Sequence, residues 1–269
     1  MRFTPLNDSG SRHMHNNHDI EEQILSRRWF YRFRLPSGRI TESYVTGEVL
    51  GFHDTRKQML LQTLEAEFGH SWERLRCLDL ACHEGYFAHA LAERGCKEVV
   101  GMDARPEHVE HANLIRRAFG DDNLRFAQGD IQRLTASEVG RFDVTLLFGI
   151  LYHLENIVGV LRLVQAVTTR ICLIETQIAP NLSGVADWGS NTSIKEIAGI
   201  LAIVDESTEL AGNNNEASLT PISLLPSLPG LMWLLKAVGF RSCKVITPPA
   251  DAYEQLVSGK RVVLAAYNV

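Results

Sequence analysis

The sequence lacks several features that mark whole classes of protein. No apolar run approaches the roughly 20 residues that span a bilayer, and the N-terminal segment has no apolar signal-peptide core. Charge of one sign does not dominate, since the formal net charge is only −5. No two cysteines have the C-x-x-C spacing typical of zinc sites. These absences predict a cytoplasmic protein that contacts no membrane, has no global attraction for nucleic acid and holds no metal.

The cysteines and the apolar content indicate the kind of interior to expect. Four of the five cysteines lie in or beside apolar, strand-length runs, which is typical of reduced, buried thiols. With 269 residues, of which 45% are hydrophobic, the chain can bury a sizeable core. Its length favours one large α/β domain with an appendage over two unrelated domains.

The most informative stretch has the pattern of a βα unit followed by a second strand. Residues 76–81 form an apolar, strand-length run, 82–85 a turn, and 86–94 a segment with helical spacing. The N-terminus of such a helix offers unpaired N–H groups to a carboxylate, a ribose hydroxyl or a phosphate. The second strand, residues 98–102, ends at Asp103, whose carboxylate can accept hydrogen bonds from both hydroxyls of a ribose. The unit therefore predicts a nucleoside site.

The turn distinguishes between two nucleoside cofactors. A dinucleotide site needs three glycines spaced G-x-G-x-x-G, and this turn has only Gly85. The run LDLACHEGYFA instead resembles the first motif of class I S-adenosylmethionine (SAM) methyltransferases, an acidic residue followed by G-x-G-x-G. Asp79 and Gly85 match that motif, whereas Ala81 and His83 replace its other two glycines, so that the loop is tighter or His83 itself touches ligand.

The resemblance implies a Rossmann-like, doubly wound, seven-stranded sheet, mostly parallel with an antiparallel last strand. It also implies SAM as cofactor and S-adenosyl-L-homocysteine as product. Asp130 and Ile131 follow the third strand and match the family's contacts with the adenine amino group and ring; alternatively, Asp130 is an N-cap for a helix over 131–139. The full predicted cofactor set is Arg56, Asp79, Ala81, His83, Gly85, Asp103, Ala104, Asp130, Ile131 and Phe148.

A second motif follows the fourth predicted strand, residues 141–148. The run GILYHLEN resembles the G-x-L-Y-H-L segment of small-molecule and tRNA-modifying methyltransferases. Ligands of open parallel sheets lie beyond the carboxyl ends of the strands, which makes His153 the first candidate for a catalytic base and Glu175, after the fifth strand, the second. Alternatively, His153 is a core histidine. The residues predicted to contact the acceptor are Tyr31, Tyr152, Gln177 and Trp188.

The N-terminal part divides into a predicted flexible leader, residues 1–18, and an extension, residues 19–56, that has a helix from Asp19 and an aromatic hairpin. The extension is similar to the one that precedes the methyltransferase domain in proteins related to the tRNA wobble-uridine carboxymethyltransferase. Alternatively, its aromatic residues only pack the extension onto the domain. The matching residues are Trp29, Leu35, Gly38, Thr41, His53, Asp54 and Arg56.

The rest of the chain, residues 57–269, is the predicted methyltransferase domain. About 50 residues, 180–229, interrupt it after the fifth strand. We expect this insertion to be helical, with an amphipathic helix over 193–204, and to form a lid, because long insertions at a strand end often cover a site. A merely decorative helical hairpin is the alternative. A last helix over 231–238 and a hairpin of strands 241–246 and 261–267 complete the sheet.

These predictions combine into one function. Methyl transfer is an in-line displacement that depends on alignment. The sequence contains no Asp/Asp/Asn metal constellation. We therefore expect a SAM-dependent methyltransferase, monomeric or homodimeric, that acts on an O or N atom of a small-molecule metabolite. A tRNA-modifying (carboxy)methyltransferase, which the acidic net charge disfavours, and a non-catalytic SAM-binding module are the alternatives.

Overall fold

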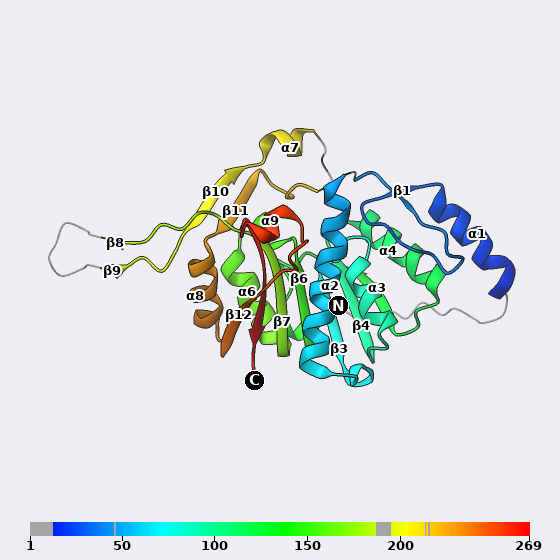
Figure 1. The fold of residues 1–269 in the computed structure, drawn as a ribbon, viewed down its shortest axis with the longest axis horizontal. Helices are drawn as coiled ribbons and strands as arrows, with labels where there is room; N and C mark the ends of the chain where they lie inside the picture. Colours follow the sequence, from blue (N-terminus) through cyan, green and yellow to red (C-terminus); the bar gives the residue numbers. More distant parts are fainter. Residues whose placement is uncertain (1–12, 46, 187–194, 213, 215) are drawn as a thin grey trace. The chain divides into compact units, whose positions relative to one another are not determined.

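The computed structural model describes residues 13–45, 47–186, 195–212, 214 and 216–269 (Figure 1). The contacts of the chain divide it into two compact units, Met1–Gly140 and Arg141–Val269.

The extension at the start of the first unit differs from the predicted hairpin. α1 (His13–Leu25) begins before Asp19, and α2 (Glu48–Phe68) before residue 57. Between them, β1 (Arg28–Trp29) and β2 (Glu42–Ser43) pair in parallel. An antiparallel bridge, Arg34 to Ile40, spans the turn at Pro36 to Gly38. Backbone hydrogen bonds from the Leu35 N–H to the Arg39 carbonyl and from the Thr41 N–H to the Phe33 carbonyl flank this bridge. The predicted hairpin is thus present only as a short stretch around the turn, and not as two full strands.

The βα repeats of the first unit follow the sequence prediction closely. β3, β4 and β5 pair in parallel, in that order. α3 packs on β3 and β4, and α4 packs on β5 and α1. The expected helix over 131–139 is shorter, because α5 starts after a capping box at Thr135 and Asp130 is therefore not its N-cap. The elements are η1 (Trp72–Arg74), β3 (Arg76–Leu80), α3 (Tyr86–Glu93), β4 (Glu98–Asp103), α4 (Pro106–Phe119), β5 (Leu124–Gln128) and α5 (Ala136–Val139).

The second unit contains a parallel pair and an antiparallel edge. β6 pairs with β7 in parallel, and β13 is antiparallel to both β7 and β12. α8 packs against α6 and β12. The elements are β6 (Phe142–Phe148), η2 (Leu151–His153), α6 (Ile157–Val167), β7 (Thr168–Gln177), α8 (Leu228–Val238), β12 (Ser242–Ile246), α9 (Glu254–Val257) and β13 (Arg261–Tyr267).

The main sheet is seven-stranded, with the order β12-β13-β7-β6-β3-β4-β5. The strands of the sheet centre are buried along nearly their whole length, as expected for parallel strands covered on both faces. The predicted Rossmann-like, mostly parallel sheet is confirmed.

The described part of the insertion contains more strand than helix, and the predicted helix over 193–204 is wrong for the described residues 195–204. β10 forms there instead and pairs antiparallel with β11. Gly199 packs closely on Gly230, since a Cβ atom at this position would lie 2.3 Å from the Cα of Gly230. Residues 187–194, which include Trp188, lie outside the described residues. The elements are β8 (Val185–Ala186), β9 (Lys195–Glu196), β10 (Leu201–Asp205), α7 (Ser207–Ala211) and β11 (Ile222–Pro226).

Two of the absences that the sequence suggested can be examined in the described part of the chain. None of its helices combines the length and the apolar character needed to cross a membrane. No group of three or more potential metal ligands occurs there either.

Candidate functional site

The loop after β3 keeps a left-handed backbone at two residues that are not glycine. Ala81 has φ 58° and His83 has φ 52°, and Gly85 follows at φ 80° as the N-cap of α3. A left-handed conformation costs an L-residue roughly 1–2 kcal/mol. At Gly85 a Cβ atom would also lie 2.4 Å from the ring of Phe126. The loop therefore has the conformation that a glycine-rich motif adopts, and it bears strain at Ala81 and His83, as functional loops often do.

Asp103, at the end of β4, is the most highly organised carboxylate beside this loop. It is 7% exposed. Oδ2 accepts a hydrogen bond of 2.8 Å from the His83 N–H, and Oδ1 accepts one of 3.0 Å from the Arg105 N–H. His108 Nδ1 lies 3.2 Å from Oδ1. Burial alone would raise the pKa of Asp103, but His108 and the Arg105 N–H outweigh it and lower that pKa, which keeps the carboxylate charged.

The acceptor capacity of Asp103 fits a ribose. An ionised carboxylate offers about four lone-pair positions, and the contacts above use three of them. The remaining position on Oδ2 can accept a hydroxyl hydrogen. The backbone conformation of the loop and this carboxylate together suit the nucleoside part of SAM.

Asp79 lies below the loop and is almost fully buried. Burial raises its pKa to about 7, and the negative charge of Asp103 adds to the effect, whereas the Ala88 N–H and Arg56 oppose it. Oδ2 of Asp79 has no hydrogen-bond partner among the described residues. Arg56 is also buried, with its guanidinium over the rings of Phe52 and Phe87 at 4.7 and 4.8 Å.

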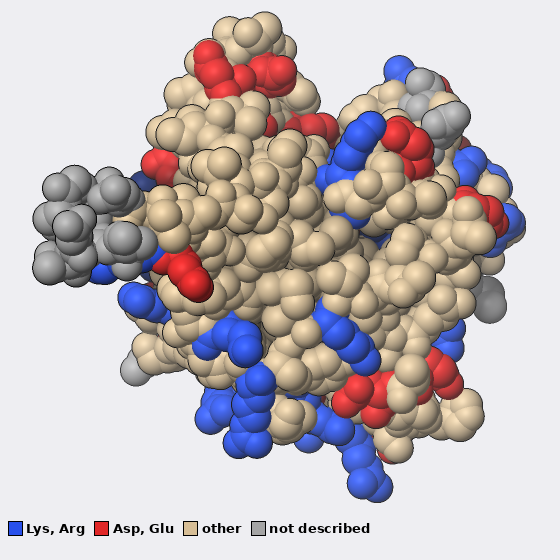
Figure 2. Space-filling model, turned by 60° about the vertical axis from the view of Figure 1, so that its left-hand side comes forward, with Lys and Arg blue, Asp and Glu red and all other residues tan. Residues whose placement is uncertain are grey.

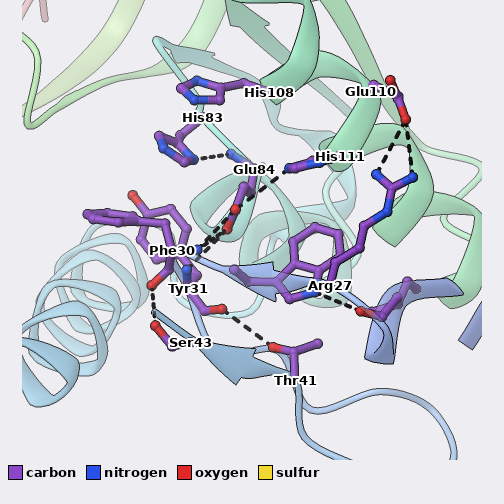
Figure 3. A network of polar contacts seen from close by, with 12 residues as sticks. Arg27, Phe30, Tyr31, Thr41, Ser43, His83, Glu84, His108, Glu110 and His111 are labelled. Carbon is purple, nitrogen blue, oxygen red and sulfur yellow. Dashed lines mark hydrogen bonds and ion pairs between the residues drawn. The ribbon is translucent and has the colours of Figure 1, made fainter. Parts of the chain in front are cut away.

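Glu84 ties the loop to the N-terminal extension (Figure 3). Both carboxylate oxygens lie 3.0 Å from the backbone N of Phe30, and Oε2 also accepts a hydrogen bond of 3.1 Å from the Tyr31 N–H. His111 Nδ1 lies 3.9 Å away. Glu84 is 2% exposed, so that these contacts are shielded from water.

The His83 side chain lies between the extension and α4. Its ring stacks on His108 at 3.7 Å and lies 4.9 Å from the ring of Phe30. Its Nδ1 accepts a hydrogen bond of 2.8 Å from the Glu84 N–H, so the neutral ring carries its proton on Nε2. The side chain that replaces the motif's glycine is thus part of the packing of the loop.

The predicted adenine contacts lie after β5. Asp130 Oδ1 accepts a hydrogen bond of 2.9 Å from the Gln132 N–H, and Oδ2 is 3.3 Å from Arg133 Nε. Ile131 is 7% exposed. The carbonyl oxygen of Ala104, after β4, accepts a hydrogen bond of 3.1 Å from Gln128 Nε2. Parallel pairing of β4 and β5 brings the ends of these two strands together.

Tyr31, one of the residues predicted to contact the acceptor, has a packing role in the described structure. It is 4% exposed and stacks on Tyr86 with the ring centroids 4.7 Å apart. This favours the alternative that the aromatic residues pack the extension onto the domain.

In the second unit, His153 is held by two residues of the insertion. His153 Nδ1 lies 3.3 Å from Glu206 Oε2 and 3.0 Å from Ser218 Oγ. Glu206 Oε2 also accepts a hydrogen bond of 2.9 Å from the Ser218 N–H. Burial would raise the pKa of Glu206, but the bonds from Ser218 and the contact with His153 outweigh it, so that the pKa is lowered.

Glu175 and Tyr152 belong to a different, buried network. Arg261 Nη1 donates to Glu175 Oε1 at 2.8 Å, and Nη2 donates to the Tyr152 hydroxyl at 3.1 Å. This buried ion pair with Arg261 favours a structural role of Glu175 over proton transfer. Phe148 and Gln177 end β6 and β7, and Phe148 is 5% exposed.

Comparison with protein families identifies the chain. Residues 72–207, just over half of its length, match the family described as a methyltransferase domain. The chain belongs to this methyltransferase family.

Curated relatives match this methyltransferase over short stretches only. The bifunctional O-antigen chain terminator methyltransferase/kinase WbdD of Escherichia coli is 29% identical over 87 residues, 32% of this chain and 12% of that protein. The ubiquinone biosynthesis O-methyltransferase of Psychrobacter arcticus is 30% identical over 92 residues, 34% and 35% of the two chains. The tRNA U34 carboxymethyltransferase of Shewanella halifaxensis is 30% identical over 82 residues, 30% and 24% of the two chains. The matched part thus spans about a third or less of these relatives.

Solved structures resemble this methyltransferase over nearly its whole length. The N-terminal domain of EvdMO1, in the presence of SAH and D-fucose, has a TM-score of 0.63 at 19% identity, covering 94% of this chain and 95% of that one. The magnesium protoporphyrin IX methyltransferase ChlM of Synechocystis, with bound SAH, has a TM-score of 0.56 at 15% identity, covering 94% and 95%. At these identities the likeness establishes the fold.

Sequence reasoning missed three residues that shape these sites. Glu84 is a motif residue, but its partners, Phe30 and Tyr31, are 54 and 53 residues away. Glu206 and Ser218 are 53 and 65 residues from His153. A polar residue in a long insertion gives no signal of such a distant partner.

Proposed function

We propose that this protein is a SAM-dependent methyltransferase that methylates an oxygen or nitrogen atom of a small molecule. The observation that carries the proposal is the pairing of a strained, left-handed loop after β3 with the charged, nearly buried Asp103 at the end of β4. Together, the loop offers room beside its backbone and Asp103 offers a hydrogen-bond acceptor for a nucleoside. The family to which the chain belongs is one of methyltransferases.

In this proposal the first unit binds the cofactor. Asp103 accepts a ribose hydroxyl, Asp130 and Ile131 contact the adenine, and the loop over 81–85, with Asp79 beneath it, lies along the amino-acid end. SAM, when bound, supplies a methyl group on a positively charged sulfur that leaves as a neutral sulfide. The residues around it need only align donor and acceptor, which can contribute roughly 7–11 kcal/mol. Arg56 is a poorer candidate for the carboxylate of SAM, because its guanidinium lies over two aromatic rings.

In the second unit we assign the base to His153. An imidazole can take the proton that a hydroxyl or ammonium acceptor must lose, since it titrates near neutral pH. Such a base contributes about 10²–10⁴-fold to the rate. Glu175 is not assigned this role because of its buried ion pair with Arg261.

A small acceptor is supported by the charge of the molecule and by two of the similar proteins. On the face drawn in Figure 2, acidic side chains occur in several places among the basic ones, so that the basic side chains form no continuous surface there. The similar EvdMO1 domain was crystallised in the presence of D-fucose, and one relative is an O-methyltransferase of ubiquinone biosynthesis. A tRNA acceptor is a second candidate, which the tRNA U34 carboxymethyltransferase relative supports.

Two measurements test the proposal. Isothermal titration with SAM and with S-adenosyl-L-homocysteine should show binding of both. Incubation with SAM and a panel of sugars, phenols and amines, followed by mass spectrometry, should show a product heavier by one CH₂ group. Methylation of total tRNA but of no panel member would favour the second candidate. Binding without any turnover would favour a non-catalytic module, and no binding would refute the proposal.

A further inference from the structure

We infer that Glu206, together with Ser218, is a positioning residue that orients His153 and fixes which of its ring nitrogens takes the proton from the methyl acceptor. The inference rests on the proposed function, since it assumes that His153 is the base. It assigns a role in the reaction to the insertion over 180–229.

The insertion is anchored against the segment that carries His153. Glu206 directly follows β10, and Ser218 lies between α7 and β11. β11 is fastened to η2 by the buried Ser223, whose hydroxyl donates a hydrogen bond of 2.7 Å to the carbonyl oxygen of Tyr152. In Figure 1, β10, α7 and β11 follow one another along the chain, and β11 returns beside β10. Tyr152 and His153 are adjacent, so this bond also fixes the backbone at the histidine.

The chemistry of the contact determines the tautomer of His153. Burial opposes ionisation of Glu206, but two bonds from Ser218 and the contact with His153 keep its carboxylate charged. A charged carboxylate can only accept hydrogen bonds. The nitrogen that faces Glu206 at 3.3 Å, Nδ1, therefore carries a hydrogen, and Nε2 holds the lone pair of the neutral ring. A second partner often selects the tautomer of a functional histidine in this way.

This arrangement gives the reaction a complete path for its proton. As the bond between sulfur and the methyl carbon breaks, the acceptor atom forms its new bond to that carbon and its proton passes to Nε2 of His153. The resulting imidazolium is stabilised by Glu206, which is an opposite charge within about 4 Å. Proton release to solvent returns the ring to its starting tautomer.

Two residues that neighbour His153 and Glu206 along the chain, Tyr152 and Asp205, have partners of their own. The Tyr152 ring lies 4.2 Å from the His153 ring, but its hydroxyl accepts from Arg261. Arg261 in turn is paired with Glu175. The carboxylate of Asp205 is exposed and accepts hydrogen bonds from the N–H and hydroxyl of Ser207. Glu206 itself lies directly against His153.

The test is a titration of the histidine rings by NMR on the uniformly ¹⁵N-labelled full-length protein, with the His153 signals assigned by their loss in His153→Gln. In the native protein the neutral His153 ring should carry its hydrogen on Nδ1. In Glu206→Gln the affinity of the ring for a proton should fall at least about tenfold, because the stabilising charge is gone. Ser218→Ala, which keeps the carboxylate, should reduce it less.

Glu209→Gln is the matched control, because Glu209 is an exposed glutamate of α7, the helix that Glu206 precedes, and its change should leave His153 as it is. A hydrogen on Nε2 in the native ring, or the same proton affinity in Glu206→Gln and Glu209→Gln, would overturn the inference. If Glu206→Gln does not fold, Glu206→Asp replaces it and should restore the native tautomer. These readouts need no acceptor, so a failure of the proposed function, seen as absent SAM binding, is distinguished from a failure of this inference.

Discussion

Both carboxylate oxygens of Glu84 lie 3.0 Å from the backbone N of Phe30. Glu84 belongs to the loop after β3, and Phe30 belongs to the N-terminal extension (Figure 3). The contact therefore makes the shape of the proposed cofactor loop dependent on the extension. It also explains how a segment with almost no regular strand holds its place.

Replacing Glu84 by Ala should lower the free energy of unfolding by roughly 2–4 kcal/mol, because the N–H groups of Phe30 and Tyr31 would lose their partner in a buried place. Glu84→Gln, which keeps one acceptor oxygen, should cost less. Denaturant unfolding measures both. Glu93→Ala, at the exposed end of α3, is the control and should stay within about 0.5 kcal/mol. Equal stability of Glu84→Ala and the control would mean that the extension is not held by this contact.

The strain in the same loop predicts the opposite effect for a different substitution. Ala81→Gly should raise the free energy of unfolding by up to about 1 kcal/mol, because glycine relieves the left-handed conformation at φ 58° while losing some chain entropy. Ala66→Gly, at an exposed position in the last turn of α2, should instead lower it by up to about 1 kcal/mol. The difference between the two variants is the quantity to compare. A loss of stability at both positions would show that the loop is unstrained.

The sequence predicted the sheet well because strand signals are local. Most of the seven strands are apolar runs of strand length, although β5 and β12 are more polar. The helices between the strands have apolar residues at helical spacing. The insertion was predicted wrongly, since residues 201–205 are helical in pattern but pair with residues 222–226, a distant partner. The extension shows the same limit: its hairpin is confined to the residues around the turn, and Phe30 and Tyr31 bond instead to the distant Glu84. The motif pointed to His153 as a candidate, whereas no signal in the sequence pointed to its partner Glu206.

Asp79 should make the stability of the protein depend on pH. The folded protein holds its proton up to about pH 7, whereas the unfolded chain releases it near pH 3.8. This group therefore stabilises the fold fully below about pH 4, and the stabilisation is lost as the pH rises through 7. Asp79→Asn cannot ionise, so its stability relative to the native protein should increase between pH 4 and 8, by on the order of 2–4 kcal/mol.

Thermal or denaturant unfolding of Asp79→Asn across this pH range checks the prediction, with Asp122→Asn on the surface as control. A constant difference between Asp79→Asn and the native protein would show that Asp79 is charged throughout. The same variant should bind SAM more weakly if Asp79 contributes to the site.

Asp103→Asn should weaken SAM binding by about 1–3 kcal/mol, because a hydroxyl would lose a charged acceptor. The substitution also changes the partners of His83 and His108, so the melting temperature must be measured beside the affinity. Asp122→Asn again supplies a control of equal charge change. Unchanged affinity by isothermal titration would remove Asp103 from the cofactor site.

Glu175 and Arg261 form a buried ion pair. We base on this pair the proposal that Glu175 has a structural and not a catalytic role. The pair is 2.8 Å long, and the two side chains are 0% and 10% exposed. Arg261→Met should therefore cost roughly 3–5 kcal/mol, because it leaves a buried charge without its partner. Glu175→Met should be costly for the same reason. The double variant should be more stable than the sum of the two losses predicts, since neither charge remains.

Lys260→Met is the control, because Lys260 and Glu254 form an ion pair of 3.0 Å at the surface and its loss should change stability by no more than about 1 kcal/mol. Denaturant unfolding gives the four free energies of the cycle. Additive losses would show that Glu175 and Arg261 do not depend on each other. If, in addition, Glu175→Gln abolished turnover without lowering stability, Glu175 and not His153 would be the base.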